Sequence, residues 1–182
     1  MLDMEIRRPT ADDVLKVSAF FRTVVTDTFL KEGIGDLVED REEEIRTKEQ
    51  YLGLDLESNG EERYFLIAVD GDDIVGTIEF GPVSELILRC TDGSYVGLME
   101  VGTVFVHPDL QGQGIGSRLL KAIYSVLHTR GFEEFCLDSG YRGSQAVWRH
   151  KFGEPEYWLK DYWGAGADHL IWRVKIQDCT SN

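Results

Sequence analysis

The chain has 182 residues, of which 42% are hydrophobic and 29% are charged, and its formal net charge is -14. This profile is typical of a soluble globular protein, and the length predicts a single domain spanning residues 1–182. The acidic excess argues against a nucleic-acid surface, which needs Lys and Arg. No apolar run is long enough to span a bilayer and the first residues do not resemble a signal peptide. We therefore expect a cytoplasmic protein that binds neither nucleic acid nor membrane.

The three cysteines, Cys90, Cys136 and Cys179, are far apart, odd in number and without C-x-x-C spacing. This arrangement indicates neither a disulfide framework nor a zinc site, so no metal is expected. Cys136 lies within an apolar run and is predicted to pack in the core.

The first third of the chain predicts a strand followed by two helices. A short run over residues 4–8 is closed by Pro9. Thr10 can cap a helix whose first turn is acidic and whose apolar residues share one face. Residues 40–56 also have a helical pattern. We interpret their acidic run, residues 42–44, as a solvated face, and a role near a substrate is the alternative.

The middle of the chain predicts β-structure. Residues 63–69 and 74–80 are apolar and β-rich and are separated by a turn sequence, so they predict a hairpin. Residues 83–90 are predicted as a further strand, which turns into a long β-rich run over residues 95–106. The segment 82–97 is the part of the core whose place the pattern determines least.

The most informative stretch reads VFVHPDLQGQGIGSRLLK. Its β-rich start ends at Pro108, which cannot continue a strand ladder, and from Ile115 the apolar residues recur at the spacing of one helix face. Between them lie Gly112, Gly114 and Gly116. Glycines can adopt positive φ and point successive N–H groups outward at the positive end of the helix. The pattern therefore predicts an anion-binding turn suited to a phosphate.

After this helix, residues 132–137 predict a strand and residues 144–152 a short helix that Gly153 interrupts. The last two strands are predicted over residues 156–163 and 169–176, around a Gly-Ala-Gly-Ala turn.

The spacing of the glycine-rich turn excludes two phosphate-binding motifs. A dinucleotide loop needs G-x-G-x-x-G, and counted from Gly112 the last position is Ser117; a P-loop needs a Gly-Lys-Ser/Thr ending, which this stretch lacks. The stretch instead resembles the acyl-CoA loop of the GNAT superfamily of N-acetyltransferases, Gln/Arg-x-x-Gly-x-Gly/Ala, through Gln111, Gly114 and Gly116. The flanking Val-His-Pro and Ser-Arg-Leu-Leu sequences look similar as well. The alternative is a tight strand-to-helix connection that binds no ligand.

The resemblance covers essentially the whole chain and implies a mixed α/β (α+β) fold, a splayed and twisted sheet of about seven strands flanked by about four helices. It also implies acetyl-CoA as co-substrate, with the pantetheine arm beside the strand before the loop and the pyrophosphate on the loop. Because the chain is acidic and CoA is polyanionic, local amides and the helix terminus must hold the anion. The residues that the resemblance assigns to acetyl-CoA are Val104, Phe105, Val106, Gln111, Gly112, Gln113, Gly114, Ile115, Gly116, Ser117 and Arg118.

An amine must lose its proton before it attacks a thioester, so the chemistry needs a base. Glu100 lies on the expected strand with Val104 and Val106, and residues an even number apart share a face. Members of the family can carry a catalytic glutamate at its position relative to Gln111. We therefore interpret Glu100 as the base, and the alternative is an ordinary polar residue near a strand start.

A general acid for the leaving thiolate is harder to assign. The family often places a tyrosine in the pattern Asn-x-x-Ala-x-x-x-Tyr-x-x-x-Gly. Here His150 stands four residues after Ala146, and Arg149 stands four residues before Gly153, so neither count reaches a tyrosine. His150 can serve chemically, although it can equally be a surface residue of a basic helix. Tyr141 is a second candidate nearby.

Aromatic residues crowd the end of the chain. In a strand, the period of two puts Trp158 and Tyr162 on one face and Tyr157 and Trp163 on the other. We expect one face to be partly exposed and used either as a homodimer contact or as a wall of the acceptor site. The alternative is that helices cover both faces.

Two classes of function follow from the resemblance. The first is an enzyme that moves an acetyl group from acetyl-CoA to a primary amine of a small molecule or peptide, by direct attack in a ternary complex. The alternative is a non-catalytic module of the same fold that binds or senses acyl-CoA. The negative charge suits a cationic acceptor or merely keeps the protein soluble, and the scaffold accommodates many acceptors.

Overall fold

The structure is a computed structural model that describes residues 3–176. Its helices are α1 (Val14–Lys31), α2 (Val38–Ser58), α3 (Glu85–Cys90), α4 (Ile115–Thr129) and α5 (Arg142–Phe152). Its strands are β1 (Met4–Arg7), β2 (Tyr64–Asp70), β3 (Asp73–Pro82), β4 (Met99–Val106), β5 (Glu134–Ser139), β6 (Tyr157–Leu159) and β7 (His169–Lys175). One-turn 3-10 helices at Ala11–Asp13 and Pro108–Leu110 precede α1 and the loop before α4.

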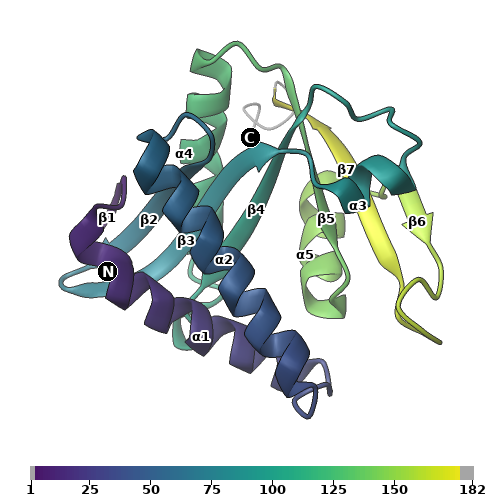
Figure 1. Cartoon of the computed structure of the whole chain (residues 1–182), viewed down its shortest axis with the longest axis horizontal. Coiled ribbons are helices and arrows are strands. Elements are labelled where there is room, and N and C mark those ends of the chain that lie inside the picture. The colour runs from purple at the N-terminus through teal and green to yellow at the C-terminus, as the bar shows by residue number, and fades with distance from the viewer. Residues whose placement is uncertain (1–2, 177–182) are drawn as a thin grey trace. The chain divides into compact units, whose positions relative to one another are not determined.

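The strands form one sheet in the order β1-β2-β3-β4-β5-β7-β6 (Figure 1). The pairs β1–β2 and β2–β3 are antiparallel, β4–β5 is parallel, and β7 is antiparallel to both β5 and β6. The predicted fold class, a mixed α/β sheet of about seven strands, is confirmed. The described residues form five α-helices where about four were expected, and the additional one is α3.

The chain divides into two compact units, and each is described by itself. The first comprises the residues up to Gly81 together with Thr103–Val126, and the second comprises Pro82–Gly102 together with the residues from Leu127 onward. Strand β4 contributes to both units. The single domain over residues 1–182 stays a prediction.

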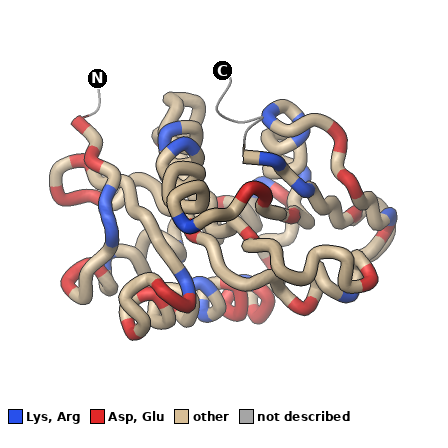
Figure 2. The backbone as a smooth tube through the Cα atoms, turned by 90° about the horizontal axis from the view of Figure 1, so that it is seen from above, with Lys and Arg blue, Asp and Glu red and all other residues tan. Residues whose placement is uncertain are grey.

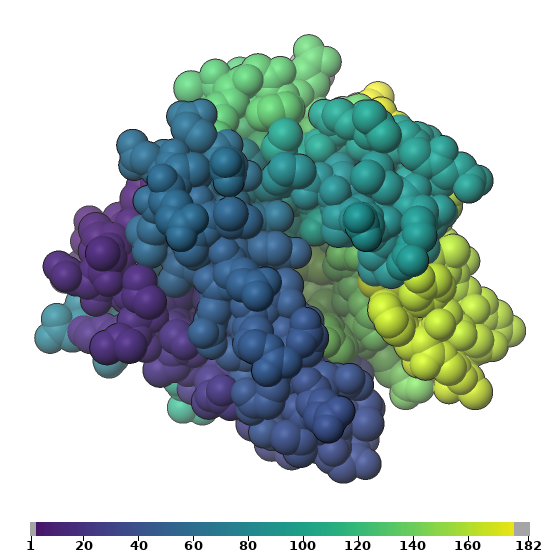
Figure 3. Space-filling view, in the orientation of Figure 1, coloured from purple at the N-terminus to yellow at the C-terminus, as the bar shows by residue number. Residues whose placement is uncertain are grey.

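In the first unit, α1 and α2 cover one face of the strands (Figures 1 and 3). Helix α1 starts after a capping turn in which the Thr10 N–H donates to the Asp13 carboxylate at 2.7 Å. The apolar residues buried together on this face are Val17, Phe20, Phe21, Val24, Leu52, Phe65, Ile67, Val69 and Ile74. On the other face, α4 packs so closely on Gly76 that a Cβ there would lie 2.8 Å from Leu119. Asp55 of α2 is fully buried and binds Arg8 and the N–H of Phe65, which fixes the helix to the strands.

In the second unit, α3 and α5 lie on opposite faces of β5 and β7 (Figure 1). The core on the α3 face consists of Ile87, Tyr95, Cys136 and Ile171. On the α5 face, Phe152 packs edge to face on Phe135, with ring centroids 6.1 Å apart. Neighbouring residues of β5 therefore pack in two different cores, because successive side chains of a strand point to opposite faces.

The predicted strand over residues 83–90 is wrong, because Glu85–Cys90 is helix α3. Ser84 caps this helix, with its hydroxyl oxygen accepting from the Ile87 N–H at 3.4 Å, and Glu85 places an acid in the first turn. A short apolar run does not distinguish a buried helix from a strand by period alone. The predicted run over residues 95–106 is also shortened, since Gly97 has φ 90 and β4 begins at Met99.

The predicted strand over residues 156–163 is wrong beyond Leu159, where β6 ends. Asp161 has a left-handed φ of 54, and its carboxylate accepts from the Gly166 N–H at 2.7 Å, so the chain folds into a loop. The period-two assignment of faces therefore does not apply to Tyr162 and Trp163.

Acidic residues are spread along both units (Figure 2). The acidic run of residues 42–44 lies on α2, where Glu42 pairs with Arg22 and Glu43 with Arg46, both at 2.7 Å. Cys90 and Cys136 are free thiols, and Cys179 lies outside the described residues. Among residues 3–176, no helix has the length and apolar character needed to cross a membrane.

Candidate functional site

The glycine-rich turn connects β4 to α4 within the first unit. Gly112 and Gly114 are exposed and adopt left-handed φ values of 77 and 86. A Cβ built on either glycine would meet nothing within 4 Å, so the turn borders open space. The first turn of any helix presents N–H groups that lack intrahelical carbonyl partners, at the positive end of the helix dipole. The turn before α4 therefore has the features of an anion site.

The other loop residues hold this turn in place. The Gln111 side-chain amide donates to the Val106 carbonyl at 3.4 Å, which folds the loop back on β4. A Cβ on Gly116 would lie 3.7 Å from Val106, so α4 begins close to the strand. The Arg118 guanidinium donates to the Met4 carbonyl of β1 at 3.3 Å. Arg118 is thus partly engaged by β1, a contact that the sequence pattern did not indicate.

Strand β4 is kinked at Thr103, whose φ of 49 is an outlier for a β-branched residue. The Thr103 hydroxyl donates to Glu79 at 3.2 Å, and the Thr103 carbonyl accepts from the Thr77 hydroxyl at 2.8 Å. Glu79 in turn pairs with Arg63 at 2.6 Å, and both side chains are buried. This polar cluster holds the left-handed residue and was not found from the sequence, because its members lie on three separate segments.

The ladder between β4 and β5 consists of two registered pairs, Met99 with Phe135 and Glu100 with Cys136. Val104, Phe105 and Val106 lie beyond the kink and are half-buried. They keep the extended backbone that the resemblance assigned to the pantetheine arm.

Glu100 lies in the second unit and is half-buried. Its carboxylate accepts from the N–H of Ser84, the cap residue of α3, at 3.2 Å. Because Glu100 and Cys136 are register partners on parallel strands, their side chains share the sheet face that α3 covers.

Cys136 is fully buried on this face. Burial raises the pKa of its thiol, and the neighbouring carboxylates of Glu100 and Asp138 raise it further. The nucleophilic form of cysteine is the thiolate, so this thiol is inert at neutral pH.

A series of hydrogen bonds on the same face includes Asp138, which lies two residues after Cys136. The Trp163 indole N–H donates to Nδ1 of His169 at 3.1 Å, and Nε2 of His169 lies 2.8 Å from the Asp138 carboxylate. A side chain on Gly140 would crowd these groups, since its Cβ would lie 3.0 Å from the indole nitrogen. Sequence reasoning missed His169 and Asp138 because the loop that brings Trp163 to them was predicted as a strand.

The two proposed acids lie on or beside α5 in the second unit. Tyr141 is the half-buried N-cap residue, and its backbone N–H donates to the Ser139 hydroxyl at 3.1 Å. His150 lies on the exposed side of the last turn of α5. Within residues 3–176, no group of three or more His, Cys, Asp or Glu side chains is arranged to hold a metal ion.

The mixed sheet, the glycine-rich turn and the helix that follows it are the features that the resemblance to the GNAT superfamily predicted. A model of the acetyltransferase (GNAT) family matches residues 30–153, and the chain belongs to this family. A search of curated proteins finds no match.

Solved structures share the fold. A protein from Desulfovibrio desulfuricans assigned to the GNAT family aligns with a TM-score of 0.69 and 21% identity, over 95% of this chain and 99% of its own. The PaiA N-acetyltransferase of Thermoplasma acidophilum, in complex with coenzyme A, aligns with a TM-score of 0.68 and 19% identity, over 96% and 99%. The YncA protein of Salmonella typhimurium, with its cofactor acetyl-CoA, aligns with a TM-score of 0.67 and 16% identity, over 96% and 94%.

Proposed function

We propose that this protein is an N-acetyltransferase that moves the acetyl group of acetyl-CoA to a primary amine of a small molecule or peptide. The observation that carries the proposal is the exposed left-handed pair Gly112 and Gly114 at the start of α4. Membership of the GNAT family and the CoA-bound neighbours support the same co-substrate.

In this proposal, acetyl-CoA binds along β4 and the loop. Residues 111–117 offer backbone N–H groups to the pyrophosphate, as bare glycines at a helix N-terminus allow. Val104, Phe105 and Val106 offer strand backbone to the amide groups of the pantetheine arm. Arg118 adds positive charge at the first turn of α4, although its contact with Met4 leaves its guanidinium less free to reach the phosphates.

Glu100 acts as the general base. The acceptor reaches the site as an ammonium ion, and Glu100 removes one proton, directly or through water, so that the nitrogen lone pair can attack the thioester carbonyl. A C–N bond forms, the nitrogen loses its second proton, the C–S bond breaks, and the CoA thiolate leaves and takes up one proton. The Ser84 N–H donates to the Glu100 carboxylate at 3.2 Å and helps to fix the position of this side chain.

Direct attack by the amine is favoured over an acyl-enzyme intermediate. The thiol of Cys136, the register partner of Glu100, is buried and has a raised pKa. Tyr141 and His150 stay as alternative proton donors to the leaving thiolate, because the side chain of each can donate a proton.

A panel of amines mixed with acetyl-CoA tests the proposal, with release of free CoA thiol as the readout. We expect thiol release with at least one amine and an increase in melting temperature with acetyl-CoA alone. A melting shift without any amine-dependent release would favour the non-catalytic acyl-CoA-binding module. No melting shift at millimolar acetyl-CoA would refute both.

A further inference from the structure

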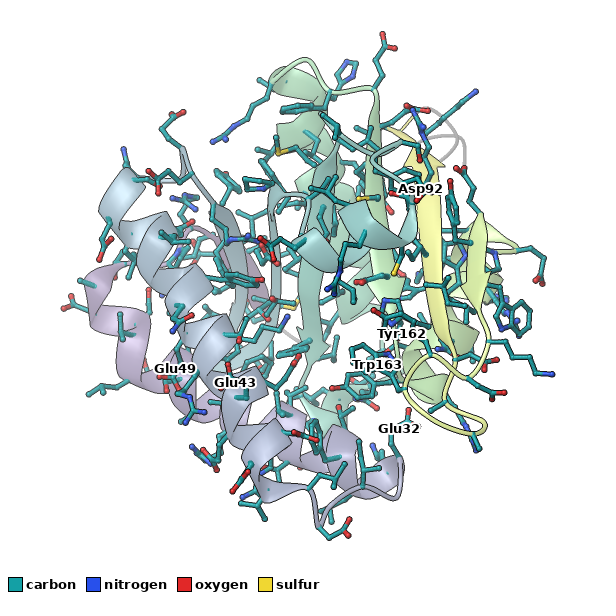
Figure 4. All side chains as sticks on the ribbon, turned by 45° about the vertical axis from the view of Figure 1, so that its right-hand side comes forward. Glu32, Glu43, Glu49, Asp92, Tyr162 and Trp163 are labelled. Carbon is teal, nitrogen blue, oxygen red and sulfur yellow. The ribbon has the colours of Figure 1, made fainter. Side chains whose placement is uncertain are left out.

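We propose that Asp138 and the indole ring of Trp163 bind a positively charged group of the acceptor other than the reacting amine. This inference rests on the proposed function and names a second feature of its substrate. The site lies within the second unit, on β5 and the loop between β6 and β7, where Tyr162 and Trp163 stand side by side (Figure 4).

The hydrogen bonds define the state of the histidine between these two residues. An indole nitrogen can only donate, so Nδ1 of His169 must accept from Trp163. The ring proton of neutral His169 is then on Nε2, which donates to Asp138 at 2.8 Å. His169 thus orients both partners without neutralising the charge of the carboxylate.

The Asp138 carboxylate retains capacity for a cation. Its side chain is 22% exposed, and among residues 3–176 its assigned polar partner is the buried His169, with no Lys or Arg in an ion pair with it. Its register partner on β7 is the apolar Ile171. A partly desolvated carboxylate with a neutral partner attracts a charged N–H donor strongly.

The Trp163 ring offers the second half of the site. The residue is 58% exposed, and Tyr162 packs edge to face on it with centroids 4.8 Å apart. Trp158 is similarly exposed, at 51%, but the Arg149 guanidinium lies 4.2 Å over its ring. In the described part of the chain no such cation stacks on Trp163, so the part of its ring that Tyr162 and His169 leave exposed can contact a ligand cation.

Several contacts that shape the loop do not involve the Trp163 ring. The Asp168 carboxylate accepts from the Trp158 indole at 2.7 Å and from the Asp161 N–H at 2.8 Å. The Trp163 backbone N–H also donates to the Ala167 carbonyl at 3.0 Å. These contacts shape the loop without using the exposed part of the Trp163 ring.

The charged group at Asp138 is distinct from the amine that reacts at Glu100. Cys136 is the register partner of Glu100, and Asp138 lies two residues farther along the neighbouring strand. Strand spacing and rise place the two positions roughly 8 Å apart. An acceptor that uses both therefore carries two positive groups separated by a chain of about five carbon atoms.

Two amines of equal chain length, 1,5-diaminopentane and 1-aminopentane, test the proposal. We expect wild type to prefer the diamine by about tenfold or more in kcat/KM, as a charge-assisted contact implies. Asp138→Asn and Trp163→Leu should each bring the ratio of the two kcat/KM values close to one. Asp92→Asn, which removes an exposed carboxylate elsewhere in the second unit, is the control and should keep the wild-type ratio.

Calorimetric titration of 1,5-diaminopentane into CoA-saturated protein examines the same site without turnover. If wild type binds the diamine and both Asp138→Asn and Trp163→Leu lose this binding, the site is supported. This holds even if no amine is acetylated, a result that would refute the proposed function but not the site. An unchanged preference and unchanged binding in both variants would overturn the proposal. The proposal would also be overturned if wild type is a dimer, Trp163→Leu is a monomer, and the variant still prefers the diamine. The rings of Tyr162 and Trp163 would then form a dimer interface. If Asp138→Asn does not fold, the kinetic and binding results for Trp163→Leu decide the outcome, because this side chain is largely exposed.

Discussion

Glu100 is the residue on which catalysis depends in the proposed reaction. Glu100→Gln keeps the shape of the side chain and removes its ability to accept a proton. We expect turnover at neutral pH to fall by roughly ten- to ten-thousand-fold, with the acetyl-CoA-induced melting shift preserved. The loss should shrink as pH rises, because more of the amine is already unprotonated.

The control for this variant is Glu85→Gln, which removes the same charge from an exposed position beside Ser84. It should leave turnover and its pH profile close to wild type. If Glu100→Gln also matches wild type at every pH, then Glu100 is structural and the base lies elsewhere.

Asp13 makes stability depend on pH. The bidentate contact with Arg7, at 2.8 and 2.9 Å, lowers the pKa of Asp13 to about 2 despite its burial. Because the folded-state pKa lies below the ordinary value of 3.8, the stabilisation is fully present above about pH 4 and is lost as pH falls toward 2.

Asp13→Asn should therefore unfold with a free energy roughly 1–2 kcal/mol lower than wild type at pH 7, after allowance for solvent screening of the partly exposed Arg7. The two proteins should converge near pH 2. Urea unfolding between pH 2 and 7 measures this difference, with the exposed neighbour Asp12→Asn as control. If the difference in unfolding free energy between the two proteins is the same at every pH, the ion pair makes no pH-dependent contribution to stability.

At the scale of elements, the loop before α4 gives the sharpest test of co-substrate binding. Gly114→Asp places a side chain and a negative charge where the phosphate would bind, so the acetyl-CoA melting shift should disappear. Gly131→Asp is a matched control, because Gly131 has φ 87 against 86 for Gly114 and lies after α4, away from its N-terminus. Both variants carry similar backbone strain. If both lose the acetyl-CoA melting shift, the loss is due to strain and not to a blocked phosphate site.

The buried Arg63–Glu79 pair supports the kink of β4. Arg63→Met leaves the Glu79 charge without its partner in the core and should cost about 3–5 kcal/mol in unfolding free energy. Adding Glu79→Leu should recover most of that loss, and urea unfolding of both variants measures it. If the double variant is stable but turnover stays low, the pair acts on catalysis through Thr103, whose hydroxyl it holds.

Elements with clear local signals were predictable from the sequence. The glycines and Pro108 bracket the β4 loop, and the capping turn at Thr10 precedes α1, so both were found within a few residues. The segment 83–90 was not, because its apolar run suits either period and the deciding Ser84 cap is a single hydroxyl. Tertiary contacts decided such ambiguous segments.

The candidate site was predictable only where one continuous stretch builds it. The anion turn is local, whereas the cluster of Thr103, Glu79 and Arg63 joins residues far apart in sequence. Likewise, Asp138 and His169 meet through the antiparallel pairing of β5 with β7, which no spacing rule reveals.

For the whole molecule, the dominant feature is an excess of 33 acidic over 19 basic residues. In the proposed reaction, such a net charge repels the polyanionic co-substrate and attracts a cationic acceptor, so the same long-range field acts on the two substrates in opposite directions. Local amides at the β4 loop must outweigh the repulsion at contact. The long-range field affects how readily each substrate approaches the protein, and salt screens this field.

Raising NaCl from about 20 to about 300 mM should therefore affect the two KM values differently, because the Debye length falls well below the dimensions of the protein. The KM for a cationic acceptor should rise several-fold, while the KM for acetyl-CoA should stay constant or fall. Steady-state kinetics with each substrate varied at saturating levels of the other measures both, and kcat should change little. A neutral osmolyte of equal osmolality serves as control. Parallel increases in both KM values would mean that salt competes at the sites, and that the overall negative charge does not guide the acceptor.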